Sequence, residues 1–211
     1  MITNKLGLPQ PFVDAATSDH RYKPGRYSVT ELLGGTCAAV LKRRHADDME
    51  VDAADNVWAI FGSAAHEILR RSKETETQLK EDWLCVDMGD GYELSGVFDL
   101  YDDSTGTVTD YKTTSVWKIQ FADYEDWRKQ TLVYCWMLRS IGFDARRGEI
   151  VALLKDHSKR KAMYDKDYPQ HPVCRVGWDF GPSDFDKISK YIKEWFDDVW
   201  RQEATPDEWL A

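Results

Sequence analysis

Two aspartates and a lysine lie close together in the middle of the chain. Asp99 and Asp110 are eleven positions apart, and Lys112 comes two positions after the second aspartate. Carboxylate pairs are ligands that suit a hard divalent cation such as Mg²⁺. An ammonium group beside them suits a developing phosphate charge or an attacking water. This combination is typical of metal-dependent cleavage of phosphodiester bonds.

The residues around this trio predict a β-hairpin. Segments 92–101 and 107–112 have the composition of strands, and the polar stretch 102–106 between them has that of a turn. Folding the hairpin would bring the two carboxylates and the ammonium group to neighbouring strand ends. Because strand side chains alternate between faces, Asp110 and Lys112 are expected on the same face of the sheet.

Each member of the trio also has a purely structural interpretation. Asp99 could hydrogen-bond a turn, and Asp110 and Lys112 could form a surface ion pair. However, aspartate is disfavoured within strands. A buried carboxylate also costs free energy unless it is paired or binds a metal. These costs favour the functional interpretation for Asp110.

Two predicted helices could add polar groups to the trio. A helix over residues 56–72 carries His66 at the edge of a broad apolar face, and neutral histidine is a good metal ligand. Gln130 and Tyr134 share a face of a second helix, predicted over 121–141. The structural alternatives are an ordinary helix-edge histidine and a solvent amide beside a core tyrosine. The broad apolar face of the first helix comprises Trp58, Phe61, Ala65, Ile68 and Leu69.

The remaining periodicity predicts an α/β fold, a mixed sheet with helices on both faces. Ser28 and Glu31 form a capping box that opens a short helix ending at the glycines 34–35. Residues 1–26 hold three of the seven prolines and are expected to be an extended lead-in to a single domain over 27–211. Further elements are predicted as a helix over 36–45, strands at 84–86, 149–154 and 173–180, and a last helix capped by 183–186 with Phe185, Ile188, Ile192, Trp195 and Val199 as its buried stripe.

The bulk composition narrows the class of protein. The chain has 42% hydrophobic and 31% charged residues, no apolar run long enough to span a membrane, and no signal peptide at its N-terminus. These features predict an intracellular protein. The net charge of −9 argues against a protein that coats nucleic acid by bulk attraction, although it leaves room for a nuclease. The four cysteines are widely spaced, so neither a zinc ribbon nor disulfides are expected.

Five sequence segments occur in the order seen in RecB-like nucleases of the PD-(D/E)XK superfamily, which the chain resembles over residues 27–160. That resemblance implies a restriction-endonuclease-like fold. The branch includes the nuclease domain of RecB, CRISPR-adaptation exonucleases, a mitochondrial exonuclease and many phage nucleases. The segments are the helical opening at 27–33 with Cys37, Gly62-Ser-Ala-Ala-His-Glu67, Gly96-Val-Phe-Asp99, Asp110-Tyr-Lys112 and Gln130-Thr-Leu-Val-Tyr134.

The resemblance also implies roles for individual residues. Lys112 would orient or deprotonate the attacking water and stabilise the charge on phosphorus. Gln130 and Tyr134 would position the DNA backbone or hold the Lys112 loop. The cation would be Mg²⁺, with Mn²⁺ as an alternative because a histidine is among the ligands. The implied ligands are His66, Asp99, Asp110 and the Tyr111 carbonyl.

Some relatives carry an iron–sulfur cluster, held by one cysteine before the nuclease core and three near the C-terminus. Cys37 matches the first position in rough placement. Only Cys174 lies in the last third of the chain, so no cluster is expected.

The resemblance implies a substrate as well: DNA ends, with a preference for single strands. The setting would be recombination, repair or phage DNA metabolism in a bacterial or phage-infected cytoplasm, and a recombination or replication protein could be a partner. Trp117 and Lys118, after the second hairpin strand, could form a lip on which bases stack, unless Trp117 is core. His157 and Lys159, in the basic segment 155–161, could contact phosphates.

Three other functions compete with this one. An endonuclease of the same fold would cut branched or specific duplex sites. A catalytically idle DNA-binding subunit would keep the fold alone, but it has no reason to retain the charged residues. A hydrolase acting on something other than nucleic acid has no supporting nucleophile motif. The oligomeric state is left open.

Overall fold

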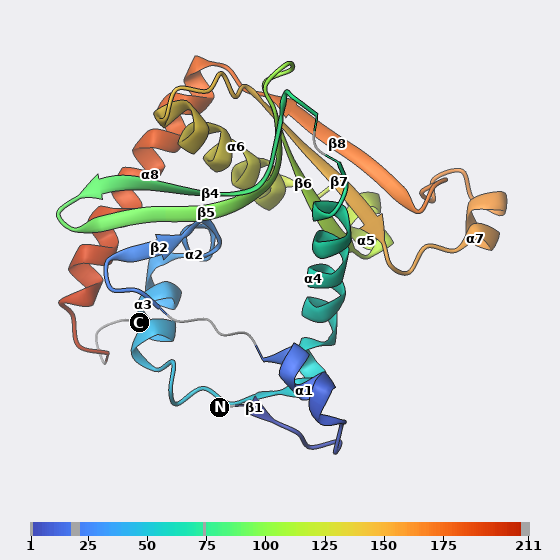
Figure 1. The fold of residues 1–211 in the computed structure, drawn as a ribbon, viewed down its shortest axis with the longest axis horizontal. Helices are drawn as coiled ribbons and strands as arrows, with labels where there is room; N and C mark the ends of the chain where they lie inside the picture. Colours follow the sequence, from blue (N-terminus) through green and yellow to red (C-terminus); the bar gives the residue numbers. More distant parts are fainter. Residues whose placement is uncertain (1, 18–21, 74, 208–211) are drawn as a thin grey trace.

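The computed structural model describes residues 2–17, 22–73 and 75–207, and its centre is a six-stranded mixed sheet (Figure 1). The strands run in the order β2-β5-β6-β7-β8, and β4 pairs with β5 outside this path. This is the expected α/β architecture, with helices on both sides of the sheet. The strands are β2 (Arg26–Ser28), β4 (Gln78–Gly89), β5 (Tyr92–Asp102), β6 (Thr107–Thr114), β7 (Arg147–Leu154) and β8 (Val173–Asp179).

Strand β5 has three neighbours, and this arrangement creates a fork in the sheet. Along one edge it pairs with β4 for most of its length. The other edge is shared: β2 pairs in parallel with residues 93–95, and β6 pairs antiparallel with residues 100–102. The last ladder pair joins Leu100 to Thr109, and beyond it β5 and β6 separate.

The helices α6 (Glu125–Ser140) and α8 (Pro182–Glu203) contribute most of the helical side of the core. The predicted stripe of the last helix is confirmed at four positions, whereas Phe185 is only partly buried. Its start was predicted two residues late: Gly181, not Ser183, caps the helix, Pro182 opens it, and the Gly181 N–H donates to the Asp184 carboxylate. The buried residues of this stripe are Ile188, Ile192, Trp195 and Val199.

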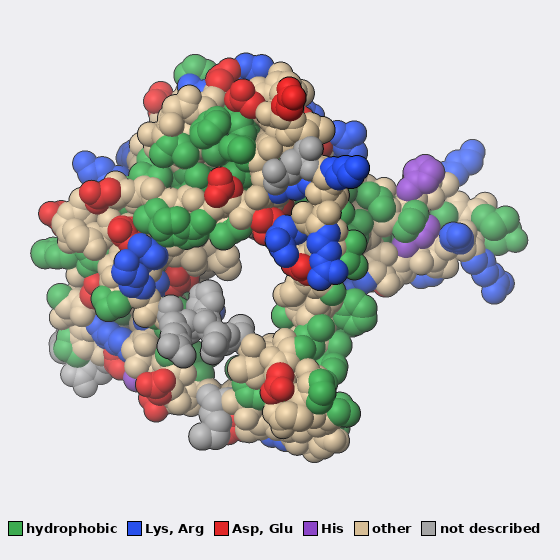
Figure 2. Space-filling model, in the orientation of Figure 1, with side chains coloured by type: hydrophobic (Ala, Val, Ile, Leu, Met, Phe, Trp, Pro, Cys, Tyr) green, Lys and Arg blue, Asp and Glu red, His purple; other side chains and the backbone are tan. Residues whose placement is uncertain are grey.

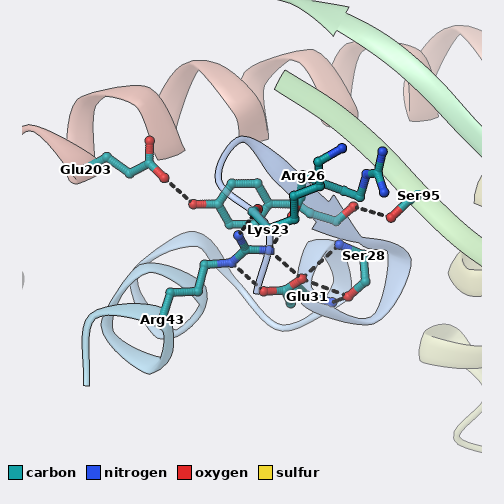
Figure 3. Close-up of polar contacts among 8 residues, drawn as sticks. Lys23, Arg26, Ser28, Glu31, Arg43, Ser95 and Glu203 are labelled. Atoms are coloured by element: carbon teal, nitrogen blue, oxygen red, sulfur yellow. Dashed lines mark hydrogen bonds and ion pairs between the residues drawn. The ribbon is translucent and has the colours of Figure 1, made fainter. Parts of the chain in front are cut away.

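A polar cluster joins the opening helices to the sheet and to α8 (Figure 3). The predicted capping box of Ser28 and Glu31 is present at the start of α2 (Val29–Leu33). Arg43, from α3 (Thr36–Arg44), donates to Glu31 and lies with its guanidinium carbon 3.6 Å from the centroid of the Tyr27 ring. The Tyr27 hydroxyl donates to Glu203 at the end of α8. These contacts tie β2, α2, α3 and α8 into one block.

The helix predicted over 56–72 is present, and its apolar face is largely exposed. Helix α4 (Val57–Arg70) has no buried residue, and Trp58, Phe61 and Ile68 are 54%, 58% and 69% exposed. The helix stands at the side of the molecule, where it contacts β6, α1 (Gln10–Ala16) and the short helix η1 (Ala53–Asn56) (Figure 1). Periodicity shows that a helix has an apolar face, but it does not supply the partner that would cover it.

The prolines of the N-terminal segment had indicated an extended lead-in, but the segment is not extended throughout. Strand β1 (Ile2–Thr3) pairs with β3 (Val51–Asp52). Helix α1 has Pro11 in its first turn, where the backbone N–H that proline lacks would have no partner within the helix. The domain boundary at residue 26 stays a prediction. Figure 2 shows an opening through the molecule between the α1 and α4 side and the α3 side, with charged side chains of both signs beside α4.

The remaining elements lie near the ends of β6 and β7. Helix α5 (Val116–Gln120) follows β6 directly. Helix α7 (Lys159–Tyr164) projects from the body on the side away from α8 (Figure 1). The four cysteines are thiols and not joined in disulfides, and Cys135 is buried in the core.

Candidate active site

The two predicted aspartates lie where β5 and β6 separate. Asp99 and Asp110 are the first residues beyond the last ladder pair of the two strands. The backbone N–H of Tyr111 donates to the Asp99 carboxylate at 2.6 Å. The Asp99 side chain therefore replaces the backbone acceptor that β5 would provide if the two strands were still paired here. Because N–H and C=O of one strand residue point to the same edge, the Tyr111 carbonyl is directed to the fork as well.

Asp110 and Lys112 share a face of β6, as predicted. The Lys112 ammonium lies 2.6 Å from Oδ2 of Asp110 and forms an ion pair with it. Gln130 of α6 donates to Oδ1 of the same carboxylate at 3.2 Å. Asp110 is only 4% exposed, so Gln130 and Lys112 are what hold its two oxygens in place.

His66 and a third carboxylate complete the site. His66 Nδ1 lies 3.1 Å from Asp99 Oδ1 and 3.8 Å from Oε1 of Glu81 on β4. One ligand atom from each of these three residues lies within 4.8 Å of the other two. The structure therefore brings together His66, Asp99, Asp110 and Lys112, and adds Glu81, which the sequence did not predict.

Glu81 was missed because β4 begins earlier than its apolar residues indicate. Only 84–86 were predicted as strand, yet β4 starts at Gln78. Lys80 and Asp82 pair with β5, whereas Glu81 between them has φ +48, which is uncommon for a residue other than glycine. The Asp90-Gly91 pair is a hairpin turn signal directly before β5. If the strand before this turn is assumed to be as long as β5, the predicted strand extends back to residue 81.

The electrostatics of the site indicate an excess of negative charge. Burial raises the pKa of Asp110 to about 6, with Asp99 adding to the effect and Lys112 opposing it. Burial and Asp99 also raise the pKa of Glu81. The hydrogen bond to Asp99 raises the pKa of His66. All three groups shift toward holding a proton, which is the response expected where a bound cation would otherwise balance the carboxylates.

Tyr134 lies beneath this site, packed on the backbone of β5. A Cβ built on Gly96 would come within 2.8 Å of the Tyr134 ring and 2.9 Å of Val29, so only glycine fits there. Tyr134 is buried, and burial, then Asp110 and Asp99, raise its pKa. The Gly96-Val-Phe-Asp99 segment thus combines a ligand with the close approach of α6.

The other predicted DNA contacts lie outside the cluster. Trp117 is exposed and stacks on Phe121. Lys118 is paired with Asp126 at 2.8 Å. The His157 ring is hydrogen-bonded to the Pro169 carbonyl, and Lys159 is exposed at the start of α7. Their contact with DNA stays a prediction.

The donor set fits a divalent cation. Glu81, Asp99 and His66 each offer a ligand atom within 4.8 Å of the other two, and Asp110 lies beside them with Lys112 as its ion-pair partner. Carboxylate and carbonyl oxygens suit Mg²⁺, and the imidazole nitrogen also suits Mn²⁺. The residues that would hold the ion are His66, Glu81, Asp99, Asp110 and the Tyr111 carbonyl.

Sequence comparison agrees with this geometry: the family described as the PD-(D/E)XK nuclease superfamily matches residues 20–209. The chain belongs to this superfamily. The resemblance drawn from the five sequence segments is thereby confirmed, and the chain is a nuclease by family. A search of curated proteins finds no significant match.

Several solved structures resemble this chain at low sequence identity, and SSO0001 shares its fold. The crystal structure of SSO0001 superimposes with a TM-score of 0.61 at 14% identity, covering 93% of this chain and 85% of the other. A phage-related exonuclease from Haemophilus somnus 129PT gives a TM-score of 0.48 at 14% identity, covering 82% and 93% of the two chains. LHK-Exo in complex with dAMP gives 0.47 at 10% identity, covering 92% and 93%.

The structure bears on membrane association in one respect. Within residues 2–17, 22–73 and 75–207, no helix combines the length and the apolarity that crossing a bilayer requires.

Proposed function

We propose that this nuclease is a divalent-metal-dependent deoxyribonuclease that degrades DNA from its ends and prefers single strands. The observation that carries the proposal is the cluster of His66, Glu81 and Asp99, with ligand atoms within 4.8 Å of one another, beside the Asp110–Lys112 ion pair at the fork. Preference for ends and for single strands comes from the RecB-like resemblance of the sequence.

Phosphodiester hydrolysis needs an activated water and a means of stabilising negative charge on phosphorus. A bound divalent cation lowers the pKa of a coordinated water and neutralises phosphate oxygens. Lys112, 2.6 Å from Asp110, would as an ammonium group orient the attacking water and stabilise the charge that develops; to take the proton of the water it would first have to be the neutral amine.

The surrounding residues hold these groups in position. Gln130 fixes the Asp110 carboxylate by its hydrogen bond, and Tyr111 fixes Asp99 through its backbone N–H. Tyr134 lies packed under the strand that carries Asp99. We expect Tyr134→Phe to weaken cleavage without abolishing it, because the ring would still fill its place.

A time course on end-labelled DNA tests the proposal. With Mg²⁺ or Mn²⁺, wild-type protein should shorten labelled single strands progressively, faster than duplexes, and EDTA should stop the reaction. Covalently closed circles should survive. Cutting of closed circles would show an endonuclease instead, and DNA binding without any cleavage would show an idle DNA-binding subunit. The product ladder gives the polarity of digestion.

A further inference from the structure

The exposed apolar face of α4 carries a pair of aromatic rings beside a lysine. Trp58 and Phe61 are three positions apart, and their ring centroids lie 5.6 Å apart at an interplanar angle of 36°. Both side chains are more than half exposed. The Lys155 ammonium lies 3.7 Å from the centroid of the Trp58 ring. In the part of the chain that the structure describes, no carboxylate pairs with this ammonium.

This aromatic pair is connected to the active site through two elements. The Lys155 N–H donates to the carbonyl of Thr114, two residues beyond Lys112 on β6. Trp58 and His66 are eight residues apart on α4, which places their backbones about 12 Å apart along the helix. At 3.4 Å per stacked nucleotide, this spans roughly three to four nucleotides.

Between Trp58 and His66, the same side of α4 has no bulky side chain. Residues 58, 62 and 66 follow one another at intervals of four, so they lie near one face of the helix. The middle position is Gly62, and a Cβ there would meet only the Thr113 hydroxyl of β6, at 3.7 Å. This side of α4 therefore lies against β6, the strand that carries Lys112, between the aromatic pair and His66.

We propose that Trp58, Phe61 and Lys155 form a stacking site for the bases of single-stranded DNA next to the active site. This inference rests on the proposed function and names the element that would favour single strands. Aromatic rings stack unpaired bases of any sequence, whereas paired bases in a duplex do not present their faces. Lys155 would meet the phosphate of the stacked nucleotide.

An occupant other than DNA fits this surface less well. A second copy of the chain or an apolar protein partner seated on Trp58 would have to bury the charge of Lys155, which costs free energy unless that charge is paired. A phosphate supplies the missing negative charge, and α4 leads from this surface to His66.

The test is equilibrium binding of a fluorescein-labelled oligo(dT) strand in EDTA, so that no cleavage occurs. Trp58→Ala should raise the Kd for the strand about tenfold, since loss of one base–aromatic stack has an effect of this size. Trp58→Phe should recover most of the affinity. Lys155→Gln should lower the slope of log K against log salt by about 0.7, the value for one phosphate contact on a single strand.

The matched control is Trp200→Ala, which removes another exposed tryptophan from α8 on the opposite side of the molecule (Figure 1). It should leave the Kd unchanged, and the affinity of the Trp58 variant for blunt duplex should stay within twofold of wild type. An unchanged single-strand Kd in Trp58→Ala/Phe61→Ala would overturn the stacking site. The stacking site would also be overturned if wild type were a dimer that the double variant converts to monomers.

The two proposals fail in different ways. If wild type digests DNA and the double variant binds and digests single strands equally well, the stacking site is wrong and the nuclease assignment stands. If binding depends on Trp58 but wild type cleaves nothing with Mg²⁺ or Mn²⁺, the stacking site stands and the proposed activity is wrong.

Discussion

Asp110 shows most clearly how single residues shape the site. Its carboxylate is almost fully buried, beside Asp99, and its direct charged partner is Lys112. A buried charge with incomplete compensation is costly, and proteins keep it mainly where it serves binding or chemistry. A divalent cation at the fork would compensate both aspartates together with Glu81.

Glu81→Gln should weaken metal binding by about ten- to a hundredfold, because it removes one carboxylate oxygen from the three groups that converge at the fork. Titration of the DNA-free protein with Mn²⁺, followed by electron paramagnetic resonance of the free ion, measures this effect. Glu76→Gln is the matched control, since Glu76 is exposed. Equal Mn²⁺ affinity in wild type and Glu81→Gln would remove Glu81 from the site.

Gly96→Ala should destabilise the protein by about 1–3 kcal/mol and reduce cleavage. The added methyl group would overlap Tyr134 and Val29, and overpacking in a core has costs of this size. Urea denaturation measures the free energy of unfolding. Gly34→Ala serves as the control, because its nearest contacts are ordinary at 3.5 Å and its φ is −89. Equal stability of the two variants would contradict the tight packing of α6 on β5.

At the scale of elements, the fork between β5 and β6 is what makes the site. The two strands stay paired only near their turn, at residues 100–102 and 107–109. Beyond that point β6 continues alongside β7, while β5 continues beside β4 and β2. The space between them exposes backbone donors and acceptors that a side chain or a ligand must meet, and Asp99 meets one of them.

The block around Tyr27 predicts a stability effect at the scale of elements. Arg43 and Glu31 form a largely buried ion pair, with side chains 12% and 15% exposed. Arg43→Ala should lower the free energy of unfolding by about 3 kcal/mol at pH 7, because it leaves a buried carboxylate without its cation. Lys42→Ala, at an exposed neighbouring position, should change it little. A loss no larger than that of the control would contradict the role of this pair.

The same pair gives a pH dependence with a defined sign. Burial raises the pKa of Glu31, but hydrogen bonds from Arg43 and Ser28 outweigh it and hold the pKa below its usual 4.5. A group whose pKa is lowered on folding stabilises the protein above its unfolded value, and this stabilisation is lost as the pH falls through the folded value. The stability difference between wild type and Arg43→Ala should therefore shrink below pH 4.5. A difference that grows on acidification would contradict the assignment.

The sequence predicted the site better where local patterns carried the information. Asp99, Asp110 and Lys112 lie in a hairpin whose strands and turn are encoded within a short segment, so their meeting followed from local geometry. Glu81 could not be found in this way, because its strand is held by pairing with β5 and its backbone departs from strand geometry.

Tertiary partners explain the other differences. The periodicity predicted the apolar face of α4, but Trp58 and Phe61 on this face stay more than half exposed in the folded molecule. Helix α1 forms although two prolines lie beside it, because one precedes the helix and the other falls in its first turn. These features could not be predicted from the sequence pattern alone, since each depends on what lies nearby in the folded molecule.

At the scale of the whole molecule, the charge is unfavourable for DNA. The net charge of −9 repels a polyanion at long range, so affinity must come from local contacts such as the metal site, Lys112 and the exposed lysines. Figure 2 shows basic and acidic side chains mixed along the visible face.

Binding of single strands should therefore have a shallow salt dependence. We expect log K to fall against log salt with a slope near −2 to −3, which corresponds to about three or four phosphate contacts at 0.7 each. Fluorescence anisotropy at salt concentrations from roughly 50 to 300 mM measures the slope. A slope steeper than about −5 would indicate a large basic surface in contact with DNA and would contradict binding by a few local contacts.

The most direct test of the account is the cleavage rate of end-labelled single-stranded DNA by wild type, Asp110→Ala and Lys112→Ala under one set of conditions with Mn²⁺. Circular dichroism checks that each variant is folded. If the groups at the fork perform metal-dependent hydrolysis, both variants should lose at least about a hundredfold in rate while remaining folded. Folded variants that cleave as fast as wild type would show that the chemistry happens elsewhere.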